Sequence, residues 1–392
     1  MIKNILLYKW HAYTEPSLFS NLEEMGYHCI VFGEKFEDYH ADALFVMKAI
    51  NCIKNENIHM VFSIDYLPLL ASASKMCELP YVAWIYDCPQ HTLLSKTTLY
   101  ANNYLFFFDR AYAEQLIRQG CENVFHLPLA VDIGFFETGT REGKVGTADY
   151  AVDISFVGSL YNEKEKWLQA EGIPAYVKGY LEGIEEAQIR IYGYNFVKEM
   201  MDEQTAREIL RKADLLLNDL YFDNPVQLVA DLVNWEISRK ERIRVIERLA
   251  IKHPIHIYTK SPFEIRENIN LCGPVDYQLE MPLVFHNSKI NLHITSKTIE
   301  TGISQRVLDI MACGGFCLAN YQQEIAELFV DGKELVMYTD MEDLAQKVDW
   351  YLEHDDERAA IARAGYEKVR KQFSMRDRLA CILEIVERDW NE

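Results

Sequence analysis

Short apolar runs alternate with amphipathic stretches through the first 130 residues. The apolar runs predict buried strands at 2–8, 27–33, 60–64, 81–86, 104–108 and 123–127. The stretches between them predict helices at about 17–26, 41–55, 67–77 and 110–119. Continuous apolar strands that alternate with helices are typical of a parallel sheet covered on both faces. Ligands bind such sheets at the carboxyl ends of the strands, and polar residues follow several of these strands: His11, Asp65, Asp87, His91 and Asp109.

The pattern breaks at 134–150, which is rich in glycine and mixed charge and reads as a linker. A second alternating unit begins with a strand at 152–158 and is interrupted by a mainly helical stretch at about 161–250, in which 189–192 fits either strand or helix. Its remaining elements are strands at 255–259, 269–272, 290–294 and 316–319, a helix at about 304–313, and helices from 341 onward. The fold class is therefore α/β, with two doubly wound units.

The bulk composition narrows the function. A length of 392 residues predicts two domains, and a net charge of −20 disfavours nucleic-acid binding. Nine scattered cysteines without a C-x-x-C pair favour a reducing cytoplasm over a disulfide framework or a zinc site. The N-terminus lacks a signal-peptide pattern, and no apolar run reaches the ~20 residues that span a bilayer. We expect a soluble cytoplasmic protein, with peripheral membrane contact and oligomeric state left open.

The segment 296–315 carries the clearest candidate chemistry. A polar loop with Lys297 and Gly302 leads into a helix that starts near Ser304, and Arg306 lies in its first turn. A helix start has unpaired N–H groups and partial positive charge, so it can bind an anion such as a diphosphate. Asp309 lies one turn later and could accept hydrogen bonds from a ribose diol. The alternative is a surface salt bridge between Arg306 and Asp309 on an ordinary amphipathic helix.

A second candidate is the strand end at Gly158 and Ser159. A glycine there allows a ligand to approach the backbone closely, although an ordinary turn would also explain it. The chain has no G-x-G-x-x-G fingerprint, P-loop, H-E-x-x-H or G-x-S-x-G motif.

Together these segments resemble GT-B glycosyltransferases, and within them the spore-maturation CgeB-like group. The resemblance covers nearly the whole chain. It rests on the runs at 84–89 (W-I-Y-D-C-P), 127–132 (L-P-L-A-V-D), 155–161 (S-F-V-G-S-L-Y), 273–277 (G-P-V-D-Y), 289–295 (K-I-N-L-H-I-T), 304–316 (S-Q-R-V-L-D-I-M-A-C-G-G-F) and 320–322 (N-Y-Q).

The resemblance implies two facing Rossmann-like domains. Residues 1–135 would form the acceptor domain, to which a final helix within 375–392 crosses back, and 150–374 would form the nucleotide-sugar domain with the helical insertion. Arg306 and Lys297 would hold the diphosphate opposite Gly158 and Ser159, with Gly302 and Ser304 at the helix start. Asp309 falls on the ribose-binding position of related retaining enzymes. The sugar-binding acidic position, eight residues earlier, falls on Thr301, so Glu300 is one residue early.

The implied reaction transfers a hexose-like sugar from a nucleoside diphosphate, with UDP the expected carrier, to a protein, glycan or cell-surface or spore acceptor of a bacterium. Arg306 would stabilise the leaving group. The resemblance also implies that no cofactor or metal ion is needed, and the absence of a D-x-D motif suited to Mg²⁺ agrees with this. An inverting route would need a base, for which His11 and Asp87 are the candidates, whereas a retaining route could dispense with one. A nucleotide-sugar epimerase or hydrolase and a non-catalytic binding protein remain alternatives.

Overall fold

The computed structural model describes residues 2–10, 12–136, 150–162, 173–213, 215, 220–264 and 266–391. The chain divides into two compact units. Unit 1 contains Met1–Ala130, Leu217–Asp223 and Phe373–Glu392, and unit 2 contains Val131–Leu216 and Asn224–Gln372. Most of the expected linker, 137–149, lies outside the described residues.

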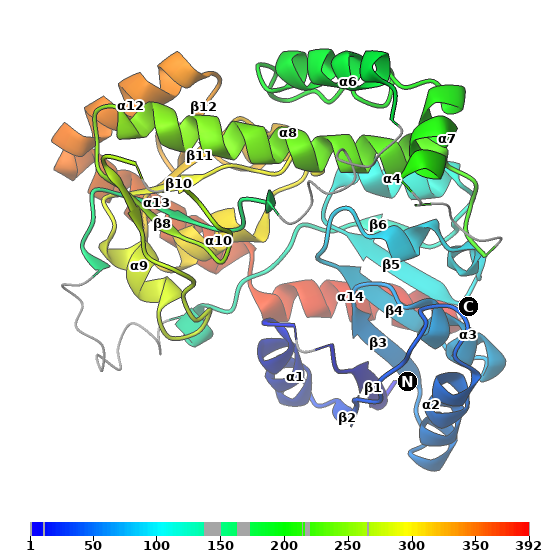
Figure 1. The fold of residues 1–392 in the computed structure, drawn as a ribbon. Helices are drawn as coiled ribbons and strands as arrows, with labels where there is room; N and C mark the ends of the chain where they lie inside the picture. Colours follow the sequence, from blue (N-terminus) through cyan, green and yellow to red (C-terminus); the bar gives the residue numbers. More distant parts are fainter. Residues whose placement is uncertain are drawn as a thin grey trace. The chain divides into compact units, whose positions relative to one another are not determined.

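Unit 1 is built on a six-stranded parallel sheet in the order β2-β1-β3-β4-β5-β6 (Figure 1). The strands are β1 (Asn4–Tyr8), β2 (His28–Phe32), β3 (Met60–Ile64), β4 (Tyr81–Ile85), β5 (Asn103–Phe107) and β6 (Val124–His126). The helices are α1 (Glu15–Glu24), α2 (Ala43–Asn55), α3 (Pro68–Met76), α4 (Arg110–Arg118) and α14 (Met375–Asn391), with 3₁₀ turns η1 (His91–Leu94) and η2 (Lys96–Leu99). Each strand and α-helix predicted within the first 130 residues is present.

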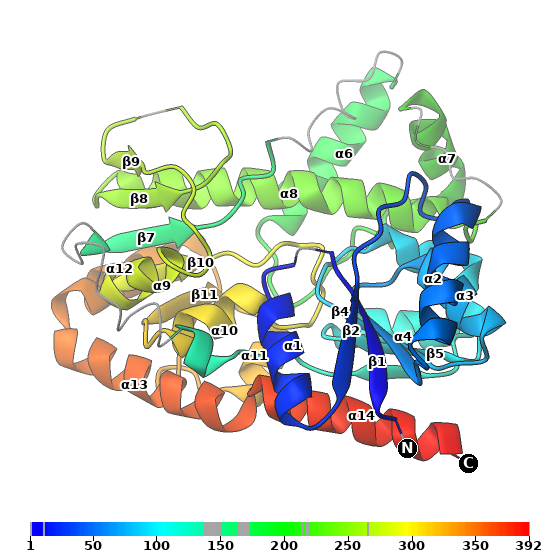
Figure 2. The same cartoon turned by 90° about the horizontal axis from the view of Figure 1, so that it is seen from below.

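The last helix, α14, completes the core of unit 1. Its apolar residues Leu379, Ile382 and Val386 are buried in the same cluster as residues of β1, β3 and β4. It packs against α1, and the two helices lie side by side in Figure 2. The helix starts with a cap in which the Ser374 hydroxyl accepts a hydrogen bond of 3.1 Å from the Asp377 backbone N–H. This agrees with the capping pattern in the sequence.

Unit 2 contains a second six-stranded parallel sheet, ordered β12-β11-β10-β7-β8-β9. Its strands are β7 (Ile154–Val157), β8 (Ile255–Tyr258), β9 (Ile269–Leu271), β10 (Ile290–His293), β11 (Cys317–Asn320) and β12 (Val336–Tyr338). Its helices are α6 (Ala175–Gln188), α7 (Glu203–Lys212), α8 (Pro225–Ala250), α9 (Met281–Asn287), α10 (Gln305–Ala312), α11 (Gln323–Leu328), α12 (Met341–Glu353) and α13 (Asp355–Gln372). The predicted α/β class with two doubly wound sheets is confirmed.

The connection from β7 to β8 is unusually long for a parallel crossover. Helix α8 runs against the sheet, and both α6 and α7 pack on it (Figure 1). In the part of the chain that is described, no helix has the length and apolar character needed to cross a bilayer.

Residues 189–192, for which the sequence left strand or helix open, form neither; they form a turn followed by a loop. The buried side chain of Gln188 explains this. Its amide nitrogen donates to the carbonyls of Ile191 (3.2 Å) and Tyr194 (2.8 Å), and its oxygen accepts from the backbone N–H of Phe196 (3.0 Å). One side chain thus satisfies backbone groups that a helix or strand would otherwise pair.

The strand order of unit 2 defines where a ligand can bind. If the strands of unit 2 are numbered 1 to 6 in chain order, from β7 to β12, their order across the sheet is 3-2-1-4-5-6. Chain order therefore runs in opposite directions on the two sides of the neighbouring strands β7 and β10. Crossover connections leave the two strands on opposite faces there, so a crevice forms beyond their carboxyl ends. These ends are Val157 and His293.

Candidate functional site

The loops that follow β7 and β10 are held together by Arg242 of α8. This guanidinium is 6% exposed and donates to the carbonyls of Ser159 (2.6 Å) and Ile294 (2.7 Å). It also lies 4.4 Å from the centroid of the Tyr161 ring. Arg242 therefore fixes the two backbone segments that border the crevice. The sequence gives no signal for this role, because Arg242 is one of several charged residues in a long helix and its partners are far away in the chain.

Gly158 ends the strand ladder of β7. Its N–H donates to the carbonyl of Tyr258 at 3.1 Å, and a side chain added there would contact the ring of Phe156 at 3.4 Å. Gly158 and Ser159 thus follow the end of β7, as predicted, and their contact with a donor stays a prediction.

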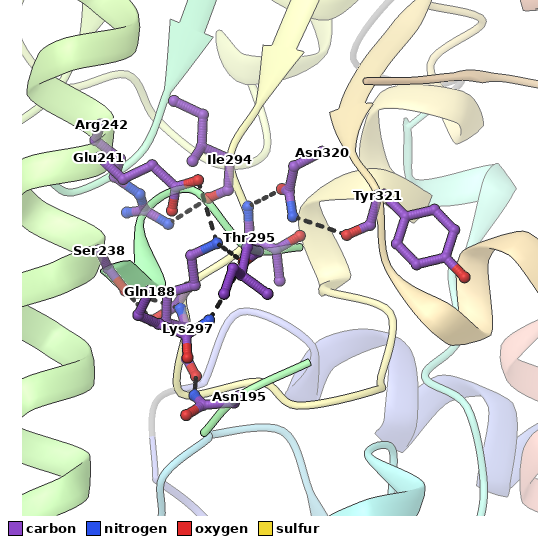
Figure 3. A network of polar contacts seen from close by, with 12 residues as sticks. Gln188, Asn195, Ser238, Glu241, Arg242, Ile294, Thr295, Lys297, Asn320 and Tyr321 are labelled. Atoms are coloured by element: carbon purple, nitrogen blue, oxygen red, sulfur yellow. Dashed lines mark hydrogen bonds and ion pairs between the residues drawn. The ribbon is translucent and has the colours of Figure 1, made fainter. Parts of the chain in front are cut away.

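Lys297 lies at the same edge, but its ammonium is directed into the protein. The nitrogen lies 3.3 Å from a carboxylate oxygen of Glu241, donates to the carbonyl of Ile191 at 3.3 Å, and sits 4.1 Å from the centroid of the Tyr192 ring. Lys297 is 8% exposed and Glu241 is fully buried. Figure 3 shows this pair beside Arg242. Through these contacts Lys297 anchors its own loop, and its contact with a diphosphate stays a prediction.

Helix α10 carries Arg306 and Asp309 as predicted. It follows Ser304, whose side chain makes no capping hydrogen bond. Asp309 is 1% exposed and accepts hydrogen bonds from the Tyr277 hydroxyl (3.1 Å) and the Gln305 amide (2.8 Å). Burial raises the pKa of Asp309, while the nearby Arg306 opposes the shift.

Arg306 forms an ion pair with Asp309 over 3.4 Å and also contacts the sulfur of Met281. Its guanidinium lies 5.7 Å from the centroid of the Phe285 ring. About a quarter of the Arg306 side chain, 27%, is exposed, whereas its partner carboxylate is buried. The pair is therefore not an exposed surface salt bridge, which was the alternative reading of the sequence.

His293 is a buried residue of this site that the sequence analysis did not select. It is the last residue of β10, and its Nε2 has no hydrogen-bond partner among the described residues. Burial lowers the pKa of His293, and the charges of Arg242 and Arg306 lower it further. The imidazole is therefore neutral between two cations. The alternation of apolar and polar residues in β10 does not show that its last residue, a histidine, is buried beside the crevice.

A pocket opens next to the β10 and β11 strand ends of unit 2. It is lined by Ile191, Tyr192, Gly193, Tyr194, Asn195, Thr295, Ser296, Lys297, Ile299, Glu300, Asn320 and Gln322. Of the predicted donor-binding residues it brings together Lys297 and Glu300, and its lining does not include Gly158, Ser159, Gly302, Ser304, Arg306 or Asp309. Glu300 pairs with Lys198 at 2.5 Å.

The predicted bases belong to unit 1. His11 lies outside the described residues, and Asp87 is exposed just beyond β4. Asp65, which follows β3, has a left-handed backbone (φ 58°). Its carboxylate accepts from the N–H groups of Tyr86 (2.9 Å) and Asp87 (3.0 Å). Burial, with the charge of Asp87, raises the pKa of Asp65 to about 7, which suits a general base better than an ordinary aspartate.

Asp109, which follows β5, has a structural role. Asp109 is fully buried and caps α4 by accepting from the N–H of Tyr112 at 3.2 Å. Within the described ranges, no three histidine, cysteine or carboxylate residues gather in a way that could hold a metal ion. Metal independence stays a prediction.

Part of the chain is similar to a known protein family, and most of it is similar to one other protein sequence. Residues 239–384, which include α10, match the protein family described as glycosyl transferase-like. An uncharacterised protein of Aquifex aeolicus is 20% identical over 292 residues, which are 70% of this chain and 68% of that protein.

Several solved structures share the fold over their whole length. HepE of Anabaena in complex with UDP-glucose has a TM-score of 0.51 at 13% identity, covering 98% of this chain and 99% of that one. Sucrose-phosphate synthase of Thermosynechococcus elongatus has a TM-score of 0.52 at 9% identity, covering 99% of both chains. A glycosyltransferase of Rickettsia africae has a TM-score of 0.50 at 13% identity, covering 99% and 98%. The fold is therefore the GT-B fold that the sequence predicts.

Proposed function

We propose that the chain is a glycosyltransferase that transfers a sugar from a UDP-sugar to a protein or glycan acceptor without a metal ion. The observation that carries the proposal is the α10 helix of unit 2. It starts with an uncapped N-terminus and holds Arg306 in its first turn and the buried Asp309 one turn later. This helix lies within the segment that matches the glycosyl transferase-like family, and the related fold of HepE binds UDP-glucose.

The chemistry follows from the charge that develops in the reaction. Breaking the anomeric bond leaves negative charge on a nucleoside diphosphate, and preorganised donors stabilise that charge where it appears. Arg306 can make a bidentate contact with phosphate oxygens, and the α10 N-terminus adds backbone N–H groups and partial positive charge. Asp309 would accept hydrogen bonds from the ribose diol, exchanging one of its present partners, Gln305 or Tyr277.

The acceptor would be activated by unit 1 if the reaction inverts the anomeric centre. Asp87 and His11 remain the proposed bases, and Asp65 joins them because its carboxylate has a raised pKa at the carboxyl end of β3. A raised pKa makes the ionised Asp65 carboxylate a stronger base than that of an ordinary aspartate.

The test is a thermal-shift screen with UDP, UDP-hexoses and UDP-N-acetylhexosamines, with and without EDTA, followed by assays of UDP release and of sugar transfer. A ligand at 100 times its dissociation constant would add about 2.7 kcal/mol of stability, which corresponds to a rise in Tm of roughly 5–10 °C for a unit of this size. We expect this rise to be unaffected by EDTA. Conversion of a donor to its epimer without an acceptor would instead indicate an epimerase, and no shift with any nucleotide at millimolar concentration would refute the proposal.

A further inference from the structure

The carboxylate of Asp309, which is proposed to bind the ribose, is covered by other side chains. Asp309 is 1% exposed. Its Oδ1 accepts hydrogen bonds from the Tyr277 hydroxyl at 3.1 Å and the Gln305 amide at 2.8 Å, and its Oδ2 pairs with Arg306 at 3.4 Å. A ribose diol donates two hydrogen bonds and needs direct access to the carboxylate. One of the covering side chains therefore has to move before a diol can bind.

Two of the side chains just named belong to the same helix as Asp309. Gln305 precedes Asp309 by four residues on α10 and Arg306 precedes it by three. Side chains at these spacings are neighbours on one face of a helix. Their backbone positions relative to the carboxylate are therefore fixed as long as α10 is intact.

Tyr277 reaches Asp309 from a different part of the chain. It lies in the loop 272–280 between β9 and α9, and its neighbours Asp276 and Gln278 are exposed. The loop turns at this point, where the Asp276 carboxylate accepts a hydrogen bond of 2.9 Å from the backbone N–H of Gln278. The Tyr277 hydroxyl can therefore leave the carboxylate through a movement of its side chain or of an exposed loop, without any change in α10.

The ring of Tyr277 packs against the first residues of unit 2, which begins at residue 131. The ring centroid lies 6.2 Å from that of Phe135 and 5.9 Å from that of Phe136, and Phe136 is buried. The guanidinium of Arg306 lies 6.0 Å from the centroid of the Tyr277 ring. Because these contacts involve the ring, the hydroxyl can be removed by substitution while the packing of the side chain is kept.

The hydroxyl of Tyr277 offers Asp309 the same kind of group as a ribose does, an O–H donor. A buried carboxylate with too few hydrogen bonds is costly. Burial raises the pKa of Asp309, and the charge of Arg306 opposes the shift. The hydrogen bonds of Gln305 and Tyr277 oppose it as well. Tyr277 thus helps to stabilise the ionised carboxylate in a buried position.

We infer that the Tyr277 hydroxyl occupies the position of a ribose hydroxyl on Asp309, and that a nucleoside diphosphate binds by displacing it while Gln305 keeps its hydrogen bond. The inference rests on the proposed function, and it selects between the two partners that a ribose could replace. Tyr277 then competes with the donor for the carboxylate. The net gain from the ribose is reduced by the hydrogen bond that Tyr277 loses.

The experiment measures by calorimetry how three variants bind UDP and 2′,3′-dideoxy-UDP, which lacks both ribose hydroxyls. Tyr277→Phe removes the hydroxyl and keeps the ring. Gln305→Met removes the amide donor and keeps the length of the side chain. Tyr150→Phe is the matched control, because the Tyr150 hydroxyl also donates to a carboxylate of unit 2, that of Glu280 at 3.2 Å. The urea unfolding midpoint of each variant checks that it is folded.

We expect Tyr277→Phe to bind UDP about 10-fold more tightly than the wild type, as for one hydrogen bond to a charged group. Its affinity for 2′,3′-dideoxy-UDP is expected to stay unchanged, because this nucleotide has no hydroxyl to take the freed position. We expect Gln305→Met not to bind UDP more tightly than the wild type, and Tyr150→Phe to leave both affinities unchanged.

Three results would overturn the inference. They are UDP binding that is unchanged or weaker in Tyr277→Phe, an equal gain for the two nucleotides, and a gain of the same size in Gln305→Met. In each of these cases the wild type still binds UDP, so the proposed function stands. If the wild type binds neither nucleotide, the proposed function falls together with the inference.

Discussion

The buried ion pair between Lys297 and Glu241 allows a quantitative test of how this site is built. The perturbation is Lys297→Met, which keeps the length and the apolar stem of the side chain but removes its charge. Glu241 is fully buried, and the Lys297 ammonium is its ion-pair partner at 3.3 Å. The variant would leave a carboxylate inside the protein without that partner, so we expect unit 2 to lose stability.

The magnitude follows from the distance and the burial. At an effective dielectric constant of about 20, two unit charges 3.3 Å apart attract each other by about 5 kcal/mol. Much of this attraction offsets the desolvation of the two ions, whereas removing one partner exposes the full cost of the other, about 3–5 kcal/mol. The double variant Lys297→Met with Glu241→Leu removes both charges, and we expect it to recover most of the loss.

The assay is urea-induced unfolding, from which the midpoint and slope give the free energy of unfolding. Lys252→Met is the matched control, because Lys252 pairs with Asp349 at 2.6 Å but the two side chains are 65% and 41% exposed. We expect the control to lose no more than about 1 kcal/mol. For Lys297→Met the expected loss would lower Tm by roughly 6–20 °C.

A Lys297→Met variant that is no less stable than Lys252→Met would contradict this expectation. Lys297 would then not be committed to Glu241, and its ammonium would be available to a ligand. A measurement of UDP affinity on the same variant separates the two roles. A normal stability with weakened UDP binding would support the diphosphate contact that the sequence predicts.

Three further predictions concern the rest of the chain. Arg306→Ala is expected to cost about 2–4 kcal/mol of transition-state stabilisation, measured as kcat for UDP release, and unchanged turnover would contradict the site assignment. The pKa of Asp65 is raised from 3.8 to about 7, so the folded state binds this proton more tightly than the unfolded state. The free energy of unfolding is therefore expected to fall by up to about 4 kcal/mol as pH rises through this range. Asp65→Asn would remove that slope, and a variant with the same dependence of stability on pH as the wild type would argue against a buried carboxyl. Gly365→Ala would place a carbon 2.3 Å from the carbonyl oxygen of Glu334, so it is expected to lower the free energy of unfolding in urea by about 1–3 kcal/mol. Gly183→Ala is the control in helix α6, where nothing lies within 4 Å of the added carbon, and it is expected to raise the free energy of unfolding by about 0.5–1 kcal/mol.

The strands of both sheets were predictable because most of them are buried on both faces and read as continuous apolar runs. Strand β12 (Val336–Tyr338) was missed, although β6 and β9, which also have three residues, were predicted. The loop at 191–195 was also missed. Its conformation depends on the buried side chain of Gln188, and the sequence does not show which way a helix-end glutamine points.

In the candidate site, contacts between residues close in sequence could be predicted, and contacts between distant residues could not. Arg306 and Asp309 are one turn apart, so their common position on α10 follows from helical geometry alone. The contacts of Arg242 with Ser159 and Ile294 and of Lys297 with Glu241 join residues more than 50 positions apart. No local pattern predicts such pairs, so the ion pair of Lys297 with Glu241 could not be derived from the sequence, and the contact of Lys297 with a diphosphate stays a prediction.

The ion pair between Arg306 and Asp309 has a consequence for how the proposed donor would bind. The two side chains partly neutralise each other across 3.4 Å, which limits the cost of holding the carboxylate in a buried position. A diphosphate would draw the guanidinium toward itself, because phosphate offers it a bidentate contact. Asp309 would then keep the hydrogen bonds of Tyr277 or Gln305 and gain those of a ribose diol. If the donor binds in this way, a nucleoside without phosphates is expected to bind far more weakly than its diphosphate.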